Sequence, residues 1–211
     1  MGWNRTGEAV RGMKEIYLDT ETTGLSPGRM FQLAYIITGK NPKGKNFFFS
    51  LPDNTMSFEA LQEHGITERR TRELADGKIF LDHYEEIKAD FEGSKLIAHN
   101  MEFDKAFILN ELRIAGLPEF KDTQYRCTMK YFTPIFKLPA VKPEHEYKYP
   151  KLKELIKEYK VQNIQALRVA RILFDCRNEK IGFHDARFDV SMLYLCCEAY
   201  LTLRELGYEQ S

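Results

Sequence analysis

The chain has 211 residues, 43% of them hydrophobic, and its 31 Lys and Arg residues balance its 31 Asp and Glu residues. A net charge of zero argues against a protein that holds nucleic acid by bulk positive charge, because such binding relies on many phosphate contacts. It leaves room for a small phosphate site assisted by metal ions. The length and the ordinary apolar fraction suit one α/β domain.

The four cysteines form no C-x-x-C pair, which predicts free thiols in a reducing cytosol rather than disulfides or structural zinc. No apolar run is long enough to span a membrane, and the first residues are too polar for a signal peptide. Residues 1–6 match a short myristoylation pattern, but we favour a loosely ordered N-terminus over residues 1–13. A cytoplasmic protein without a membrane partner is therefore expected.

Three early runs rich in β-branched and aromatic residues predict strands, at 16–20, 31–38 and 46–51. The second and third are joined by residues 39–44, which carry a strong turn signal. These strands are expected to form the antiparallel start of a sheet.

Helical signals follow the early strands. Ser57 as N-cap and Gly65 as stop predict a helix over 57–64, and Thr67 is typical of a second capped start. Apolar residues that recur every three or four positions predict a helix over 79–91.

The rest of the chain alternates between helix and strand. A short strand at 95–99 precedes a helix that Asn100 caps and that ends at Ala115, and 125–129 is the last predicted strand. Residues 134–150 are predicted to be irregular, and helices are expected at 152–159, 164–174 and about 185–206. Together these elements predict one α/β domain with a mixed five-stranded sheet flanked by helices.

Two carboxylates stand one residue apart at the end of the first predicted strand. Asp19 and Glu21 would point to the same face, because the side chains of a strand alternate with a period of two. Like charges this close repel, and burial raises the cost. A divalent cation between them would make the arrangement tolerable, so the pair predicts half of a metal site.

Two further acids lie on the apolar stripes of predicted helices. Asp104 precedes Ile108 and Leu112 at steps of four, and Asp189 repeats the pattern on the last helix. A buried carboxylate costs several kcal/mol unless it is paired or coordinated. Four acids without a matching Lys or Arg predict oxygen ligands for Mg²⁺ or Mn²⁺ rather than for zinc.

His184 lies five residues before Asp189, just outside the last helix, where it is expected to be near the metals but off the packed face. Histidine can take a proton from water near neutral pH, so His184 is a candidate base.

Each of these residues also has an ordinary structural explanation. An acid in a first helical turn often only complements the helix dipole, and this would explain Asp104 and Asp189. A histidine before a helix is often a cap. The order of these residues along the chain and the alignment of the two acids with apolar stripes favour a metal site over the separate structural explanations.

The same residues resemble the three motifs of the DEDDh (DnaQ-like) 3′–5′ exonucleases. The matching runs are Asp19-Thr-Glu21-Thr-Thr-Gly-Leu, His99-Asn-Met-Glu-Phe103-Asp104 and His184-Asp-Ala-Arg-Phe-Asp189, and His64-Gly-Ile-Thr resembles a softer fourth signature. The resemblance spans about residues 14–200. A histidine five residues before the last Asp is typical of this branch rather than of the tyrosine branch.

The resemblance implies a ribonuclease H-like fold and a two-metal site, with His184 as general base. The implied ligands of the two divalent cations are Asp19, Glu21, Asp104 and Asp189. A pocket for the terminal nucleotide would be formed by Thr22, Thr23, Gly24, Leu25, His64, Ile66, Asn100 and Phe103. Phe103 has two open interpretations of equal weight, a base-stacking platform or a core residue.

Residues 137–160 and 161–183 are long for the family, and both flank the third motif. Lys137, Lys142, Lys148 and Lys151 are candidates for an outer track along a nucleic-acid strand, although a solvated surface loop is the favoured interpretation. Arg69, Arg70 and Arg72 are equally ambiguous.

The leading functional hypothesis is an exonuclease that releases 5′-mononucleotides from the 3′ end of single-stranded DNA, in proofreading or repair, with a DNA polymerase as a possible partner. RNA 3′-end trimming is the first alternative, because no residue reads the 2′-hydroxyl with confidence. A non-catalytic module that binds nucleic acid or a polymerase is the second, and a structural metal protein of another fold is the third.

Overall fold

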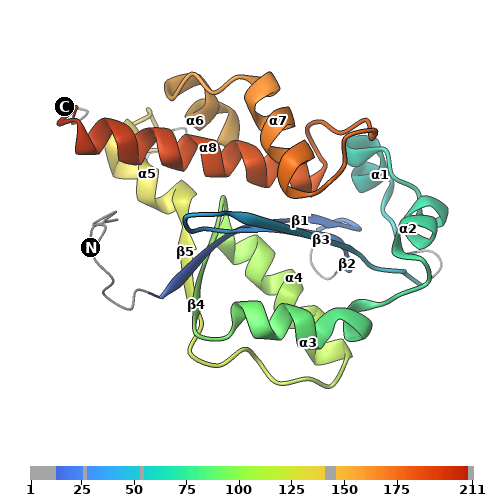
Figure 1. Ribbon diagram of the computed structural model, residues 1–211. Helices are drawn as coiled ribbons and strands as arrows, with labels where there is room; N and C mark the ends of the chain where they lie inside the picture. The colour runs from blue at the N-terminus through green and yellow to red at the C-terminus, as the bar shows by residue number, and fades with distance from the viewer. Residues whose placement is uncertain (1–12, 26–27, 53–54, 141–145, 209–211) are drawn as a thin grey trace.

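The structure is a computed structural model that describes residues 13–25, 28–52, 55–140 and 146–208. A five-stranded sheet lies between two layers of helices (Figure 1). In the order β3-β2-β1-β4-β5, the first three strands are antiparallel, and β4 and β5 run parallel to β1. The strands are β1 (Lys14–Thr22), β2 (Met30–Ile37), β3 (Lys43–Phe48), β4 (Ser94–Ala98) and β5 (Gln124–Cys127). The predicted mixed five-stranded α/β fold is confirmed.

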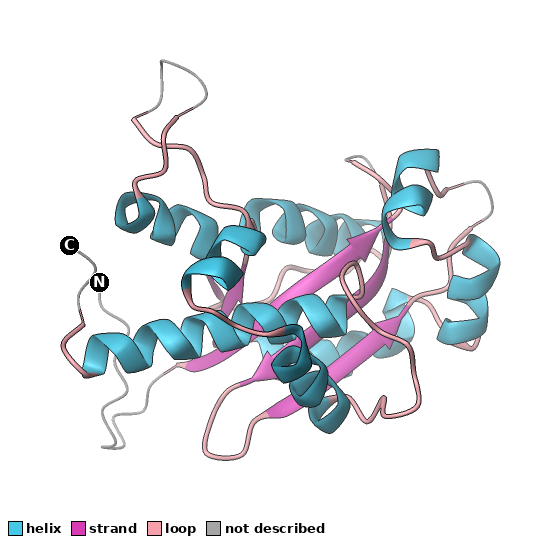
Figure 2. Cartoon of the chain, turned by 90° about the horizontal axis from the view of Figure 1, so that it is seen from above, coloured by secondary structure: helices cyan, strands magenta, loops and turns pink. Residues whose placement is uncertain are grey.

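Four helices cover one face of the sheet. α8 lies across the strands in Figure 2 and contacts both β1 and β2. Its buried residues Val190, Leu193 and Cys197 pack with Tyr17 of β1 and Ile36 of β2. The long last helix is thereby fixed against the central strand. The helices of this layer are α5 (Thr128–Phe136), α6 (Leu152–Glu158), α7 (Asn163–Leu173) and α8 (Ala186–Glu205).

The other face is covered by α3 (Phe80–Phe91) and α4 (Met101–Ile114) (Figure 1). Ile16 and Leu18 of β1 point to this side and pack with Ile108 and Leu112 of α4. β1 is thus covered on both faces, which suits its apolar run Ile16-Tyr17-Leu18. The active-site motifs all adjoin this central strand or the helices packed on it.

Two short helices, α1 (Phe58–His64) and α2 (Glu68–Ala75), lie beside one end of the sheet (Figure 1). Ser57 caps α1 by accepting a hydrogen bond from the N–H of Ala60, and Gly65 ends it in a left-handed conformation. Thr67 caps α2 in the same way. These caps are as the sequence predicts.

Three predicted elements are wrong in part. The third strand occupies 43–48 rather than 46–51, and its Gly44 is needed because a Cβ there would lie 2.7 Å from the carbonyl oxygen of Leu173. The last strand ends at Cys127, because Thr128 and Met129 begin α5. That helix also runs to Phe136 through Pro134, into a segment expected to be irregular.

The remaining expectations concern residues outside the described ranges, the cysteines and membrane-spanning segments. The described residues do not include the myristoylation pattern or Lys142. Of the predicted loosely ordered segment 1–13, they include only Met13. The four cysteines are free, as predicted. No helix in the described part of the chain is long and apolar enough to cross a membrane.

Candidate active site

Asp19 and Glu21 point from β1 toward α8. Tyr17 lies two residues earlier on the same face of the strand, where its ring contacts Tyr194 of α8 with centroids 5.5 Å apart. The regular pairing of β1 with β2 is interrupted between Glu21 and Thr22. The carboxylates therefore stand side by side where the strand leaves the sheet.

Asp189, in the first turn of α8, completes a cluster with these two acids. Oxygen atoms of Asp19, Glu21 and Asp189 all lie within 4.8 Å of one another. Leu193, Cys197 and Leu201, which follow Asp189 at steps of four, are buried as the sequence predicts. The packing of α8 on the sheet thus sets the position of the third carboxylate.

Asp104 approaches from the opposite layer, but it is not among the three acids whose oxygen atoms lie within 4.8 Å of one another. It lies in the first turn of α4, is only 3% exposed, and accepts a hydrogen bond of 2.9 Å from the hydroxyl of Thr20. Thr20 points to the α4 side because it alternates with Asp19 and Glu21. Asn100 occupies the N-cap position of this helix with φ 79°, but its side chain forms no capping hydrogen bond. Asn100 is thus the N-cap residue, as predicted, but it acts through its left-handed backbone between β4 and α4 rather than through its side chain.

The pKa of each of the four carboxylates is raised above its usual range. Burial, with the charges of Asp104, Asp189 and Glu21, holds the pKa of Asp19 well above its usual range, and burial with the charge of Asp189 does the same for Glu21. Burial also raises the pKa of Asp104 to about 7, against the hydrogen bond from Thr20. It raises the pKa of Asp189 to about 7, although the N–H of His184 and the charge of Lys153 oppose the shift.

The donor set fits a divalent cation. Asp189 Oδ2 accepts the backbone N–H of His184 at 2.9 Å, whereas the buried Oδ1 has no hydrogen-bond partner in the described part of the chain. A buried acceptor without a partner costs about 1–3 kcal/mol, so this oxygen needs a ligand. Carboxylate oxygens alone suit hard cations such as Mg²⁺ or Mn²⁺.

His184 stands at the rim of the cluster, with its side chain 41% exposed. Its backbone is left-handed, with φ 66°, and its N–H is held by Asp189. Nδ1 lies 3.8 Å from Glu63 Oε1 of α1. His184 is not the cap of α8, because Asp185 occupies that position and accepts the N–H of Arg187.

A pocket of about 440 Å³ opens over the acids and brings most of the predicted nucleotide-binding residues together. Phe103 lines this pocket and also packs on Phe107 of the core, so both of its predicted roles are compatible with the structure. Gly24 has φ +147°, and a Cβ there would lie 3.0 Å from Ser57 Oγ, so the chain can pass this point only as glycine. The predicted residues on the pocket wall are Thr22, Gly24, Leu25, His64 and Phe103, with Asp19, Glu21, His184 and Asp189.

Three of the predicted pocket residues, Thr23, Ile66 and Asn100, do not line this pocket. Thr23 is 2% exposed and its hydroxyl accepts the N–H of Arg29. The N–H of Ile66 donates to His64 Nδ1. Asn100 forms the left-handed junction before α4.

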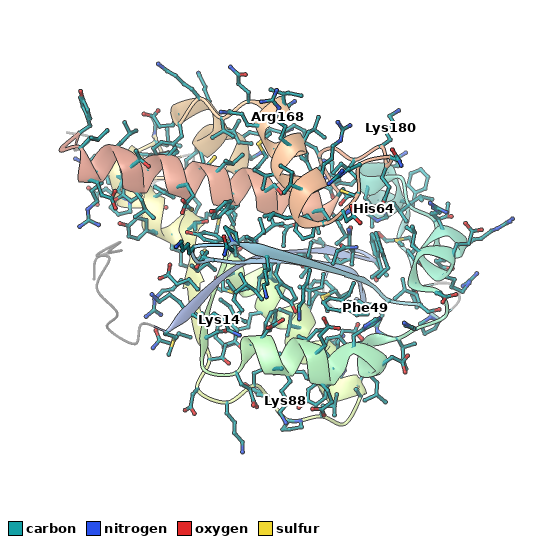
Figure 3. All side chains as sticks on the ribbon, in the orientation of Figure 1. Lys14, Phe49, His64, Lys88, Arg168 and Lys180 are labelled. Carbon is teal, nitrogen blue, oxygen red and sulfur yellow. The ribbon has the colours of Figure 1, made fainter. Side chains whose placement is uncertain are left out.

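His64 lines the pocket as a neutral imidazole. Its ring contacts Phe31, and in Figure 3 it lies between α1 and the sheet. Burial lowers the pKa of His64 to about 4. Because Nδ1 accepts the N–H of Ile66, the proton resides on Nε2, which is buried without a partner among the described residues.

Sequence reasoning missed the residues that hold the third motif. The carboxylate of Asp185 is bound by the guanidinium of Arg187 at 2.8 and 2.9 Å and by the side chain of Gln32 at 3.2 Å. Glu179 also pairs with Arg187 at 2.8 Å. Arg187 is only 5% exposed. An acid and a base two residues apart in the motif were the available signal, but nothing in the sequence places Gln32 beside them.

Sequence reasoning also missed a buried ion pair behind the first motif. Arg29 donates through Nε and Nη2 to Glu111 of α4, at 2.7 and 2.8 Å, and Glu111 accepts the N–H of Met30 at 3.1 Å. Asn110 donates to the carbonyl of Gly28. The turn after Thr22 is therefore fixed to the helix that carries Asp104.

A family model described as "Exonuclease" matches residues 16–194, from the start of β1 into α8. The chain belongs to the exonuclease family. The predicted assignment to the DEDDh (DnaQ-like) 3′–5′ exonucleases, with the ribonuclease H-like fold, is confirmed. That residues 1–211 form a single exonuclease domain stays a prediction.

Relatives within this exonuclease family include a DNA polymerase III subunit epsilon of Rickettsia conorii. It is 30% identical over 189 residues, which cover 85% of this chain and 78% of the relative. The subunit epsilon of Salmonella typhimurium is 30% identical over 104 residues, 45% of this chain and 42% of the relative.

Solved structures show the same fold at low sequence identity. E. coli exonuclease I in complex with a dA16 oligonucleotide has a TM-score of 0.67 at 16% identity, and its zinc-bound complex with single-stranded DNA has a TM-score of 0.66 at 18%. Both alignments cover 93% of this chain and 42% of exonuclease I, so the chain spans less than half of that enzyme.

Proposed function

We propose that this protein removes nucleotides one at a time from the 3′ end of single-stranded DNA and releases 5′-mononucleotides. The observation that carries the proposal is the convergence of Asp19, Glu21 and Asp189 within 4.8 Å, with a buried oxygen of Asp189 left without a partner. Asp104 adds a fourth carboxylate from the opposite helix layer. The four acids would hold two divalent cations, either Mg²⁺ or Mn²⁺.

Bound divalent cations would lower the pKa of attacking water and neutralise charge on the scissile phosphate. The chain itself would supply the base, because His184 is exposed at the rim of the acid cluster and its backbone is fixed by Asp189. His184 would accept the proton of the attacking water as the water approaches the phosphorus. Asp189 therefore has two roles in this proposal, as a ligand through Oδ1 and as an anchor for His184 through Oδ2.

The pocket over the acids would hold the terminal nucleotide. Phe103 offers a ring face worth about 1–3 kcal/mol per stacked base, and His64 lines the same pocket. Gly24 and Leu25 form the rim.

A DNA substrate is supported by the relatives, which are named as DNA polymerase subunits, and by the similarity to a structure solved with single-stranded DNA. The same relatives support a DNA polymerase as a partner. RNA trimming remains the alternative substrate class, and a non-catalytic binding module is disfavoured by the complete set of acids. The cytoplasmic location stays a prediction.

The test uses matched single-stranded DNA and RNA oligonucleotides with a 5′ label, incubated with Mg²⁺ or Mn²⁺ and resolved at single-nucleotide length. We expect a ladder that shortens from the 3′ end, faster on DNA, and no ladder with EDTA. A faster ladder on RNA would transfer the proposal to RNA trimming. Cutting at internal positions, or no cutting with either metal, would contradict it.

A further inference from the structure

The active site carries a strong excess of negative charge, yet its substrate is a polyanion. Most cations near it are already paired with acids, including Lys130 with Glu102, Lys148 with Glu154, and Arg187 with Asp185 and Glu179. Lys148, a candidate for the outer track, is thus held by a partly exposed ion pair with Glu154. A strand that leaves the pocket therefore needs another cationic contact.

Lys153 on α6 is free to make that contact. It is exposed, and it forms no ion pair or hydrogen bond within the described ranges. Its Nζ lies 5.6 Å from the ring centroid of Phe183, the residue immediately before His184. Phe183 is itself 39% exposed and rests against Phe188 of α8, with centroids 5.1 Å apart. The ammonium group is thus held beside the third motif.

The contact with Phe183 places Lys153 near the acid cluster. Phe183 adjoins His184 in the chain, and the backbone N–H of His184 donates to Asp189 Oδ2 at 2.9 Å. Lys153 is thus placed to attract a phosphate of a strand whose end is bound over the acids.

The helix that carries Lys153 is anchored to the second motif. His99, which follows β4, contacts the carbonyl of Pro150 through Nε2 and the hydroxyl of Thr128 through Nδ1, both at 3.0 Å. Burial lowers the pKa of His99 to about 4, so the ring is neutral, and its Nε2–H donates to the carbonyl of Pro150. The start of α6 is thereby fixed relative to the second motif.

We propose that Lys153 binds a phosphate of the nucleic-acid strand on the 5′ side of the scissile bond, with Phe183 orienting its ammonium group. The inference rests on the proposed function and adds a residue that positions the strand outside the nucleotide pocket. Lys157 provides a matched control, because it is an exposed lysine one turn farther along the same helix.

Two substrates separate this contact from the chemistry. A single-stranded oligonucleotide carries the upstream phosphate, whereas the p-nitrophenyl ester of thymidine 5′-monophosphate has one phosphate and no upstream strand. Lys153→Ala is expected to lower kcat/KM about tenfold on the oligonucleotide, chiefly through KM, and to leave the ester unchanged. The slope of log KM against log salt should fall by roughly 0.7, the value for one phosphate contact on a single strand.

Lys153→Arg should retain most of the oligonucleotide activity, and Lys157→Ala should match the wild type on both substrates. The melting temperature of each variant checks that the fold is intact. The inference is overturned if Lys153→Ala matches the wild type on the oligonucleotide, if it loses activity equally on the ester, or if Lys157→Ala loses as much. A wild type inactive on both substrates would instead refute the proposed function.

Discussion

At the scale of single residues, the strongest consequence concerns Asp189. Its carboxylate is buried beside two others, and burial raises its pKa to about 7, so ionisation above that pH costs stability in the absence of metal. Asp189→Asn keeps the shape and removes the charge. We expect nuclease activity to vanish and the metal-free melting temperature to rise by about 2–6 °C, which corresponds to roughly 1–2 kcal/mol in a chain of this length. A calorimetric scan in EDTA and the oligonucleotide assay measure the two effects. Residual cleavage, or a lower melting temperature, would contradict the assignment.

The second residue-scale prediction concerns His184. Its imidazole stands at the rim of the acid cluster, where removing it leaves all four carboxylates in place. His184→Ala should lower kcat by about 10²–10⁴-fold, the usual contribution of a general base, with little change in the affinity for Mn²⁺. Single-turnover cleavage and calorimetric titration of Mn²⁺ measure the two quantities. A variant that keeps wild-type kcat would exclude His184 as the base.

The sequence predicts the acids but not their supports. Asp19 and Glu21 are found because two acids share one face at the end of a strand, and Asp104 and Asp189 because a charged residue on an apolar helix stripe conflicts with local periodicity. Gln32 and Glu111 carry no such conflict, since their partners are distant in the chain, 153 residues away for Gln32 and 82 for Glu111. Contacts of that kind depend on the packing of whole elements, which local pattern does not encode.

At the scale of elements, α4 and the turn after β1 are joined through the Arg29–Glu111 pair. Glu111→Ala would leave the partly buried guanidinium of Arg29 and the buried N–H of Met30 without their acceptor, at a cost of about 2 kcal/mol. Glu102→Ala on the same helix, whose partner Lys130 is on the surface, should cost less than about 1 kcal/mol. Urea unfolding of both variants measures the difference. Equal losses would show that the Arg29–Glu111 pair does not fix this turn.

Element boundaries show where local signals are sufficient. Caps at Ser57 and Thr67 are strong chemical signals, and both helices begin as predicted. The start of β3 was missed because Gly44 resembles a turn residue, whereas here it admits the backbone of α7. The helix at Thr128–Phe136 was missed because Pro134 lies within it. Gly44 and Pro134 were thus interpreted as ends of regular structure, whereas Gly44 lies within β3 against α7 and Pro134 lies within α5.

At the scale of the whole molecule, the acid cluster couples stability to pH and metal. Burial raises the pKa of Asp104 and of Asp189 to about 7, above their usual 3.8, so the native state holds protons that the unfolded chain releases. The contribution of these groups to stability is present below pH 4 and is lost as the pH rises to about 7. Mg²⁺ binds the ionised native form and should raise the melting temperature more at pH 8 than at pH 5.

Melting curves at both pH values, with Mg²⁺ or EDTA, measure this dependence. The double variant Asp104→Asn/Asp189→Asn is the control, and its response to Mg²⁺ should disappear. A Mg²⁺ effect that is larger at pH 5, or that survives in the double variant, would show that the cluster is not the site of binding.

The most direct test of the central claim is the anomalous scattering of manganese in crystals of the protein grown with Mn²⁺. We predict anomalous peaks between the carboxylates of Asp19, Glu21 and Asp189, within bonding distance of Asp189 Oδ1, and with Asp104 beside them. No peak at the cluster, or manganese bound only elsewhere on the protein, would contradict the account.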